Sequence, residues 1–127
     1  MIGQMNVSKD LRWVWLDLEM TGLNEANCVI LQIAMVITNI DLEEIVSKEI
    51  TIWQPDSELN KMDPYVFNIH VKNSLIDLVR ISNISLMQAE LQLMEILTKY
   101  VGYKKGILKW YIQMLKESLQ MWLLILL

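Results

Sequence analysis

The sequence is poor in cysteine, histidine, proline and glycine. Its 127 residues include one Cys, one His, two Pro and four Gly. Because Cys28 is the only thiol, an internal disulfide is excluded, and a lone thiol is typical of a reducing cytoplasm. The low Pro and Gly content, together with 54% hydrophobic residues, excludes a disordered chain. We therefore expect one folded domain, located in the cytoplasm.

The sequence also lacks an excess of positive charge and long apolar runs. Eleven basic residues against fifteen acidic ones give a net charge of −4. Such a chain is not drawn to phosphates at long range, so any nucleic-acid chemistry needs a local device such as a bound cation. The longest apolar run, Met121–Leu127, is far too short to span a membrane, and residues 1–12 lack the apolar core of a signal peptide. We expect no membrane association.

Residues 11–53 have the pattern of three strands. An aromatic and aliphatic run occupies Trp13–Leu18, and Cys28–Thr38 is nearly continuously apolar. Glu44–Trp53 alternates more clearly between apolar and polar residues, and Asn39–Asp41 supplies a turn before it. The second and third runs therefore predict an antiparallel hairpin beside the first strand.

The period then changes from that of strands to that of helices. Three local signals predict helix starts: Asp63-Pro64, Ser74 with Asp77, and Ser85 with Gln88. Gly102 is a left-handed cap that ends the last of these helices. Strands followed by helices indicate an α/β or α+β fold.

The chemistry of the chain is concentrated in the run WLDLEMTGL, residues 15–23. Asp17 and Glu19 are two positions apart, so on a strand they point to the same face with Cα atoms about 6.5–7 Å apart. Two such carboxylates favour Mg²⁺ or Mn²⁺ over zinc. Thr21-Gly22 allows a tight turn that brings Leu23 near whatever binds the metal. For an isolated pair of this kind, the simpler interpretation is a strand end where acids reach solvent.

The same run resembles the first catalytic motif of the oligoribonuclease family. The members of this family are 3′-to-5′ exonucleases of the DEDDh group. The resemblance continues through VILQIAMVITN and ITIWQPDSELNKMDPYVFNIHVKNSLIDLV and covers about residues 12–108. It implies an α/β, ribonuclease H-like fold, with the N-terminal three-stranded antiparallel part of a mixed sheet followed by helices. We accordingly divide the chain into an N-terminal segment (1–11), an incomplete exonuclease domain (12–108) and a non-matching apolar tail (109–127).

The resemblance also implies roles for individual residues. Asp17 and Glu19 match metal-binding catalytic acids, Leu23 matches a wedge between the bases of a dinucleotide, and His70 matches a histidine near the substrate phosphate. Tyr65 stands where the family usually has a stacking Trp. The implied activity is Mg²⁺- or Mn²⁺-dependent hydrolysis of very short RNA, such as dinucleotides, to 5′-mononucleotides by a homodimer. Judged without the family, Leu23 and Tyr65 read as packing residues and His70 as a structural one.

The sequence departs from the family pattern in two regions. Gln32 lies where the family commonly has Glu, which weakens a contact behind the metal ligands. The family needs four acids and a histidine base, yet the last Asp is Asp77 and the only His is His70. The pattern stops after Leu108, which a premature end or a reading-frame change in the gene explains. We therefore expect the later strands and helices to be missing and exonuclease activity to be slight or absent.

Several alternatives remain open from the sequence. The apolar stretch Ile107–Leu127 has the spacing of a helix, and as a divergent tail it would cap an exposed sheet edge. A second hypothesis for the function, independent of the tail, is a non-catalytic remnant that at most binds short oligonucleotides. A DNA exonuclease of the proofreading type is a weaker alternative.

Overall fold

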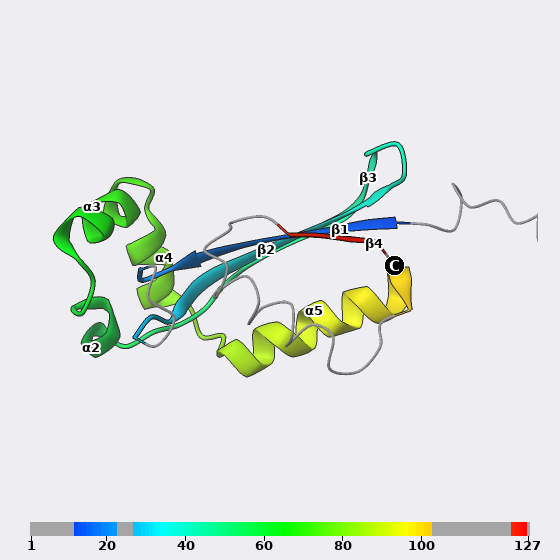
Figure 1. Cartoon of the computed structure of the whole chain (residues 1–127). Coiled ribbons are helices and arrows are strands. Elements are labelled where there is room, and N and C mark those ends of the chain that lie inside the picture. The colour runs from blue at the N-terminus through cyan, green and yellow to red at the C-terminus, as the bar shows by residue number, and fades with distance from the viewer. Residues whose placement is uncertain (1–11, 23–26, 103–122, 127) are drawn as a thin grey trace, which may run out of the picture.

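The computed structural model describes residues 12–22, 27–102 and 123–126 (Figure 1). In this part of the chain, neighbouring strands form one antiparallel sheet in the order β3-β2-β1-β4. The strands are β1 (Arg12–Met20), β2 (Ile30–Asn39), β3 (Glu44–Thr51) and β4 (Leu123–Leu126). The predicted three-stranded antiparallel unit, with its β2–β3 hairpin, is confirmed.

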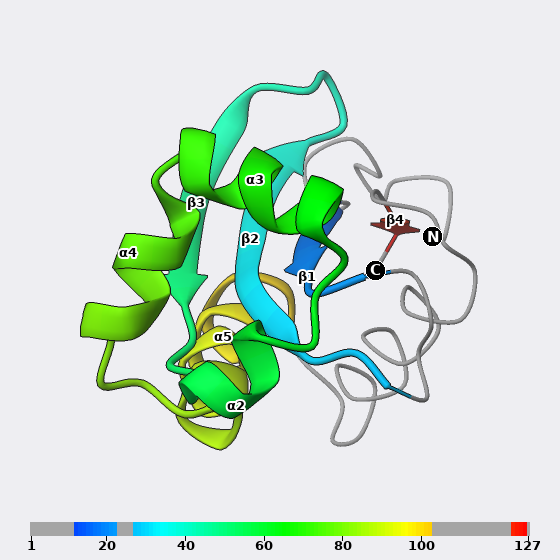
Figure 2. The same cartoon turned by 90° about the vertical axis from the view of Figure 1, so that its left-hand side faces the viewer.

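Helices lie on one face and at one end of this sheet. They are α2 (Asp56–Leu59), α3 (Pro64–Lys72), α4 (Leu75–Ile81) and α5 (Leu86–Val101). Figure 1 shows α5 running along one face, whereas α2, α3 and α4 gather beyond the end of the strands, as the end-on view in Figure 2 also shows. None of the helices in the described ranges has the length and apolar character needed to cross a membrane. The predicted order of strands followed by helices, an α/β arrangement, is confirmed.

The main core lies between the sheet and α5. Strand β1 alternates between buried and half-buried residues, as a strand with one covered face does. The fully or nearly fully buried side chains of β1 and α5 share one cluster: Val14, Leu16, Leu18, Ala89, Leu93 and Leu97. Because this face of β1 is used for packing, the intervening residues are directed to the opposite face.

A second cluster fixes α2, α3 and α4 to the end of the sheet. It joins Leu31 of β2 to buried side chains of α2, of α4 and of the segment before α3, namely Leu59, Met62, Leu75, Ile76 and Val79. Val66 and Phe67 of α3, which are partly buried, pack against this cluster. Leu31 lies where the pairing of β1 with β2 shifts, between Glu19 and Met20. This bulge turns Leu31 out of the main core and places α3 beside the end of β1.

The local signals for helix ends are largely confirmed. The Asp63 carboxylate accepts a hydrogen bond from the Tyr65 backbone N–H at 2.8 Å, at the start of α3. Ser85 and Gln88 form a reciprocal capping box at the start of α5. Gly102 ends that helix with φ of 68°, the left-handed conformation that glycine adopts most easily.

The helix start predicted at Ser74 is confirmed, because α4 begins at Leu75 directly after it. Ser74 itself has φ of 63° and makes no capping hydrogen bond with its side chain. Its backbone N–H instead donates to the Val71 carbonyl at 3.0 Å and closes the tight connection from α3 to α4. The turn geometry therefore determines the conformation of Ser74.

The predicted helix over Ile107–Leu127 is wrong where the structure describes it. Leu123–Leu126 forms β4 and pairs in antiparallel register with Trp13–Leu16 of β1. The edge of β1 offers backbone N–H and C=O groups that need partners, and a short extended segment provides them. The alternative that the tail covers a sheet edge therefore holds for these residues, but as a strand and not as the expected helix. Residues 107–122 and 127 lie outside the described part.

Truncation of a buried side chain of α5 is expected to destabilise the protein. Leu93 is completely buried, so Leu93→Ala should lower the free energy of unfolding by about 2–5 kcal/mol through lost burial and a cavity. Leu91, 54% exposed on the same helix, is the matched control, and Leu91→Ala should change stability little. Urea unfolding of both variants measures this, and equal losses would contradict the assigned core.

Candidate metal-binding site at the end of the first strand

Asp17 and Glu19 lie on β1, on the face opposite α5. Asp17 pairs with Ala34 of β2, and Glu19 pairs with Gln32. Between them Leu18 points into the main core, so the pleat directs both carboxylates to the other face. The small side chain of Ala34 leaves Asp17 without a bulky cross-strand neighbour on that strand.

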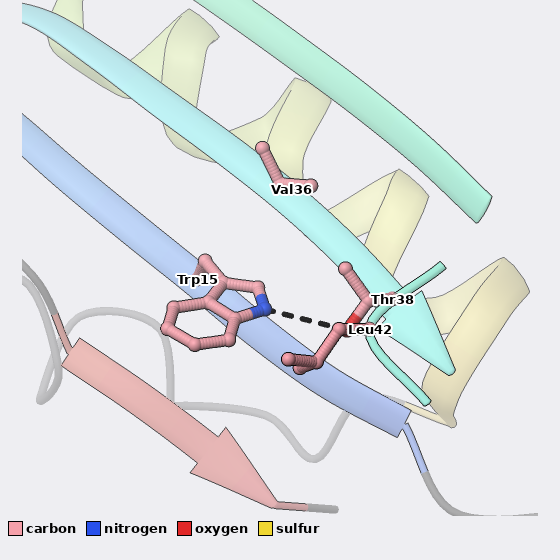
Figure 3. A pocket seen from close by; sticks show the side chains of 4 residues that line it. All are labelled: Trp15, Val36, Thr38 and Leu42. Carbon is pink, nitrogen blue, oxygen red and sulfur yellow. Dashed lines mark hydrogen bonds between the residues drawn. The ribbon is translucent and has the colours of Figure 1, made fainter. Parts of the chain in front are cut away.

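The same face is open further along β1. Trp15, Val36, Thr38 and Leu42 line a hollow of about 260 Å³. Figure 3 shows these four side chains on the side of the sheet away from α5. The Trp15 indole N–H donates to the Thr38 hydroxyl oxygen at 3.3 Å. Trp15 precedes Asp17 by two positions, so the indole and the carboxylate share this face.

The Asp17 carboxylate carries an unfavourable charge in the metal-free protein. Its Oδ1 atom is buried and has no hydrogen-bond partner among the described residues. Burial raises the pKa of Asp17, the charge of Glu19 raises it further, and a hydrogen bond from the Leu18 backbone opposes both. A cation between Asp17 and Glu19 would counteract both causes, because its positive charge favours the charged form of the Asp17 carboxyl.

Gln32 lies beside the acids, in register with Glu19. Its side-chain Nε2 donates to the Thr51 hydroxyl of β3 at 3.0 Å. The amide is therefore held across the sheet by a partner that the sequence pattern did not reveal. Because Gln32 is neutral, it adds no negative charge to Asp17 and Glu19.

His70 lies against the backbone at the end of β1. It is 7% exposed, and its Nε2 is 3.0 Å from the Met20 carbonyl oxygen. This contact places α3 next to the candidate site and requires a proton on Nε2 if the ring donates. The structural interpretation of His70 accounts for this contact, while its role near a substrate phosphate stays a prediction.

The two other predicted substrate residues differ in what the structure describes. Tyr65, in the first turn of α3, is 74% exposed, so its ring is not a packing residue. An exposed aromatic face on the helix that also holds His70 is suited to stacking on a base. Leu23 lies outside the described residues.

The donor set fits a hard divalent cation in part. Carboxylate oxygens are the ligands that Mg²⁺ and Mn²⁺ prefer, and the orphaned Asp17 oxygen is accounted for if an ion binds there. In the described ranges, no group of three or more His, Cys, Asp or Glu residues is arranged to hold a metal. Asp17 and Glu19 would therefore share an ion with water or substrate oxygens.

Comparison with known proteins agrees with this geometry. A family model described as Exonuclease matches residues 14–121. The chain belongs to the exonuclease family. This family generally uses divalent metal ions. The match begins inside β1 and includes Asp17, Glu19, Tyr65 and His70.

Individual relatives of known sequence are oligoribonucleases, which confirms the resemblance stated from the sequence. The chain is 41% identical over 94 residues to the oligoribonuclease of Francisella tularensis subsp. tularensis strain WY96-3418, covering 73% of this chain and 53% of that protein. It is 39% identical over 101 residues to the oligoribonuclease of Acinetobacter baylyi, covering 79% and 55% respectively. The chain thus spans about half the length of these relatives. The domain boundary at Leu108 stays a prediction.

The raised pKa of Asp17 predicts how stability depends on pH in metal-free buffer. A carboxyl with a higher pKa in the folded state makes the folded protein less stable as pH rises from its ordinary value of 3.8 through the raised value. Asp17→Asn abolishes this loss, so it should be more stable than the wild type at pH 7.

The gain should disappear below about pH 3.8, where both states of the wild type bind the proton. Urea unfolding with a chelator across this pH range measures the effect. Asp41→Asn, which removes one charge from an exposed turn, is the control. Equal stability of Asp17→Asn and the wild type at every pH would contradict the unfavourable charge at Asp17.

Proposed function

We propose that this chain carries the first metal-binding motif of a 3′-to-5′ exoribonuclease that degrades very short RNA to 5′-mononucleotides. The observation that carries the proposal is the buried Oδ1 of Asp17, which has no hydrogen-bond partner among the residues that the structure describes and lies on the same face of β1 as Glu19. The family and the names of the relatives support the reaction class. The name oligoribonuclease supports short RNA over the DNA substrate of a proofreading enzyme.

In this proposal Asp17 and Glu19 hold Mg²⁺ or Mn²⁺ through their carboxylate oxygens. When bound, such ions activate water and neutralise charge on the leaving oxygen. Asp17 and Glu19 provide negatively charged oxygens for the cation on the face of the sheet opposite α5. Exposed Tyr65 provides a surface on which a base of the RNA can stack. Leu23 and His70 are proposed to contact the dinucleotide as well.

Two further expectations belong to the same proposal. Homodimer formation is implied by the oligoribonuclease resemblance. A cytoplasmic location is supported by the lone thiol of Cys28 and by the turnover of short RNA as the proposed task. Both are independent of the geometry of Asp17 and Glu19.

A second candidate function is binding of short oligonucleotides without turnover. It is favoured by the finding that Asp17 and Glu19 lack a third metal-binding neighbour within the described ranges. An undercharged site holds divalent ions less tightly, and a reaction without a positioned base is slower by about 10²–10⁴. We therefore expect turnover by this chain to be slight.

A 5′-labelled RNA dinucleotide distinguishes the two functions. The protein is incubated with the dinucleotide and Mn²⁺, and both nucleotide release and binding are measured for the wild type, Asp17→Asn and Glu19→Gln. Slow release that both substitutions abolish supports the exonuclease. Binding without release supports the second candidate, and neither binding nor release would contradict both. Competition by a DNA dinucleotide tests the preference for RNA.

Tyr65 is expected to contribute to binding through its ring alone. Tyr65→Ala should weaken dinucleotide binding by about 1–3 kcal/mol, the usual value for one stacked base, whereas Tyr65→Phe should retain it. Ile81→Ala, at a residue 78% exposed on α4, is the control for loss of an exposed apolar side chain. Fluorescence anisotropy with a labelled dinucleotide measures the affinities. Equal affinity of the Ala and Phe variants would exclude stacking on Tyr65.

A further inference from the structure

The three residues that follow Glu19, namely Met20, Thr21 and Gly22, each contact a neighbouring part of the fold. The Met20 carbonyl contacts His70 of α3, as described above. Thr21 bonds to Val29, just before β2, and Gly22 lies against Cys28. These contacts begin where the regular pairing of β1 with β2 is interrupted, between Glu19 and Met20.

Thr21 restores the pairing beyond this bulge with two hydrogen bonds to a single residue. Its backbone N–H donates to the Val29 carbonyl at 3.1 Å, and its hydroxyl oxygen accepts from the Val29 backbone N–H at 3.1 Å. Thr21 is 6% exposed, so water does not readily replace either bond. The side chain thereby does what a paired backbone carbonyl would do in a regular strand.

Gly22 adds a close steric contact to these hydrogen bonds. A Cβ atom built on Gly22 would lie 3.0 Å from the Cys28 Sγ atom, closer than such atoms normally approach. A side chain at Gly22 therefore requires the Cys28 side chain or its backbone to shift by a few tenths of an ångström.

The contacts of the backbone after Glu19 affect where the Glu19 carboxylate lies relative to Asp17. Asp17 and Glu19 lie two positions apart on one face of β1, so their like charges repel each other. Glu19 forms the last regular pair of β1 before the bulge at Leu31, so a loosened strand end would let its carboxylate turn away from Asp17 toward water. Holding the backbone after Glu19 opposes that movement.

We propose that Thr21 is a positioning residue, whose paired hydrogen bonds with Val29 hold the end of β1 so that the Glu19 carboxylate stays beside Asp17 for a divalent cation. The inference rests on the proposed function, which requires cation binding at these two acids. Thr21 itself does not touch the ion in this arrangement. It acts through the backbone that carries Glu19.

Calorimetric titration with Mn²⁺ tests the inference on the full chain. Thr21→Val removes the hydroxyl acceptor at nearly constant shape and should weaken Mn²⁺ binding about tenfold, as loss of groups supporting a metal site usually does. Thr21→Ser keeps the hydroxyl and should bind Mn²⁺ like the wild type. Thr38→Val is the matched control, because Thr38 is also 6% exposed and its hydroxyl accepts a hydrogen bond on the same sheet, from Trp15.

Amide hydrogen exchange provides a readout that does not depend on the metal. The Val29 amide should lose protection in Thr21→Val and keep it in Thr21→Ser. If that amide loses protection while Mn²⁺ affinity is unchanged, the positioning role is wrong. If the wild type binds no Mn²⁺, or binds it equally after Asp17→Asn, the proposed function itself fails, which is a different outcome.

If Thr21→Val does not fold, variants at Gly22 and Cys28 test the same inference. Gly22→Ala should push the strand end away from Cys28 and weaken Mn²⁺ binding. Adding Cys28→Ala removes the obstructing sulfur and should restore the affinity. Unweakened binding in Gly22→Ala, or no recovery in the double variant, would overturn the inference.

Discussion

The pleat of β1 is the constraint on which the rest of the structure depends. Val14, Leu16 and Leu18 are buried against α5, so the side chains between them must point to the other face. A shift of one residue in this register would bury Asp17 and Glu19 and expose the leucines, at a prohibitive cost in burial of charge. Packing of these side chains in the core therefore also determines which face of the sheet Asp17 and Glu19 point to.

The acid pair is unfavourable for the folded protein and suitable for a cation. Asp17 gains no hydrogen bond for its buried Oδ1 within the described part of the chain, and it lies near a second negative charge. Core packing along α5 offsets this cost. An overall charge of −4 gives the protein no general attraction for RNA, so a bound divalent cation is the local device that would attract a phosphate.

Local signals in the sequence predicted most of the fold and part of the site. The strands, the Asp63 cap, the capping box at Ser85 and the end at Gly102 each depend on a few neighbouring residues. The spacing of Asp17 and Glu19 predicts that both acids share a face of the strand, but the family resemblance, and not the spacing alone, favours a metal site there. The strand at Leu123–Leu126 was mistaken for a helix, because its partner is more than a hundred positions away along the chain.

Other features also lay beyond sequence reasoning, for the same physical reason. Ser74 is left-handed because two helices meet tightly there, and the one-turn helix α2 follows from its packing of Leu59 into the second cluster. Thr21 was interpreted only as a turn residue, since its bonds to Val29 depend on the bulge after Glu19. Tyr65 was weighed as a packing residue, and its exposure could be learned only from the position of α3.

The most direct test of the central claim is a crystal structure with Mn²⁺, using anomalous scattering to locate the ion. The account predicts one or more Mn²⁺ peaks within bonding distance of carboxylate oxygens of both Asp17 and Glu19, on the face of the sheet away from α5. Carboxylates pointing apart, or Mn²⁺ bound elsewhere with no peak at this pair, would contradict it.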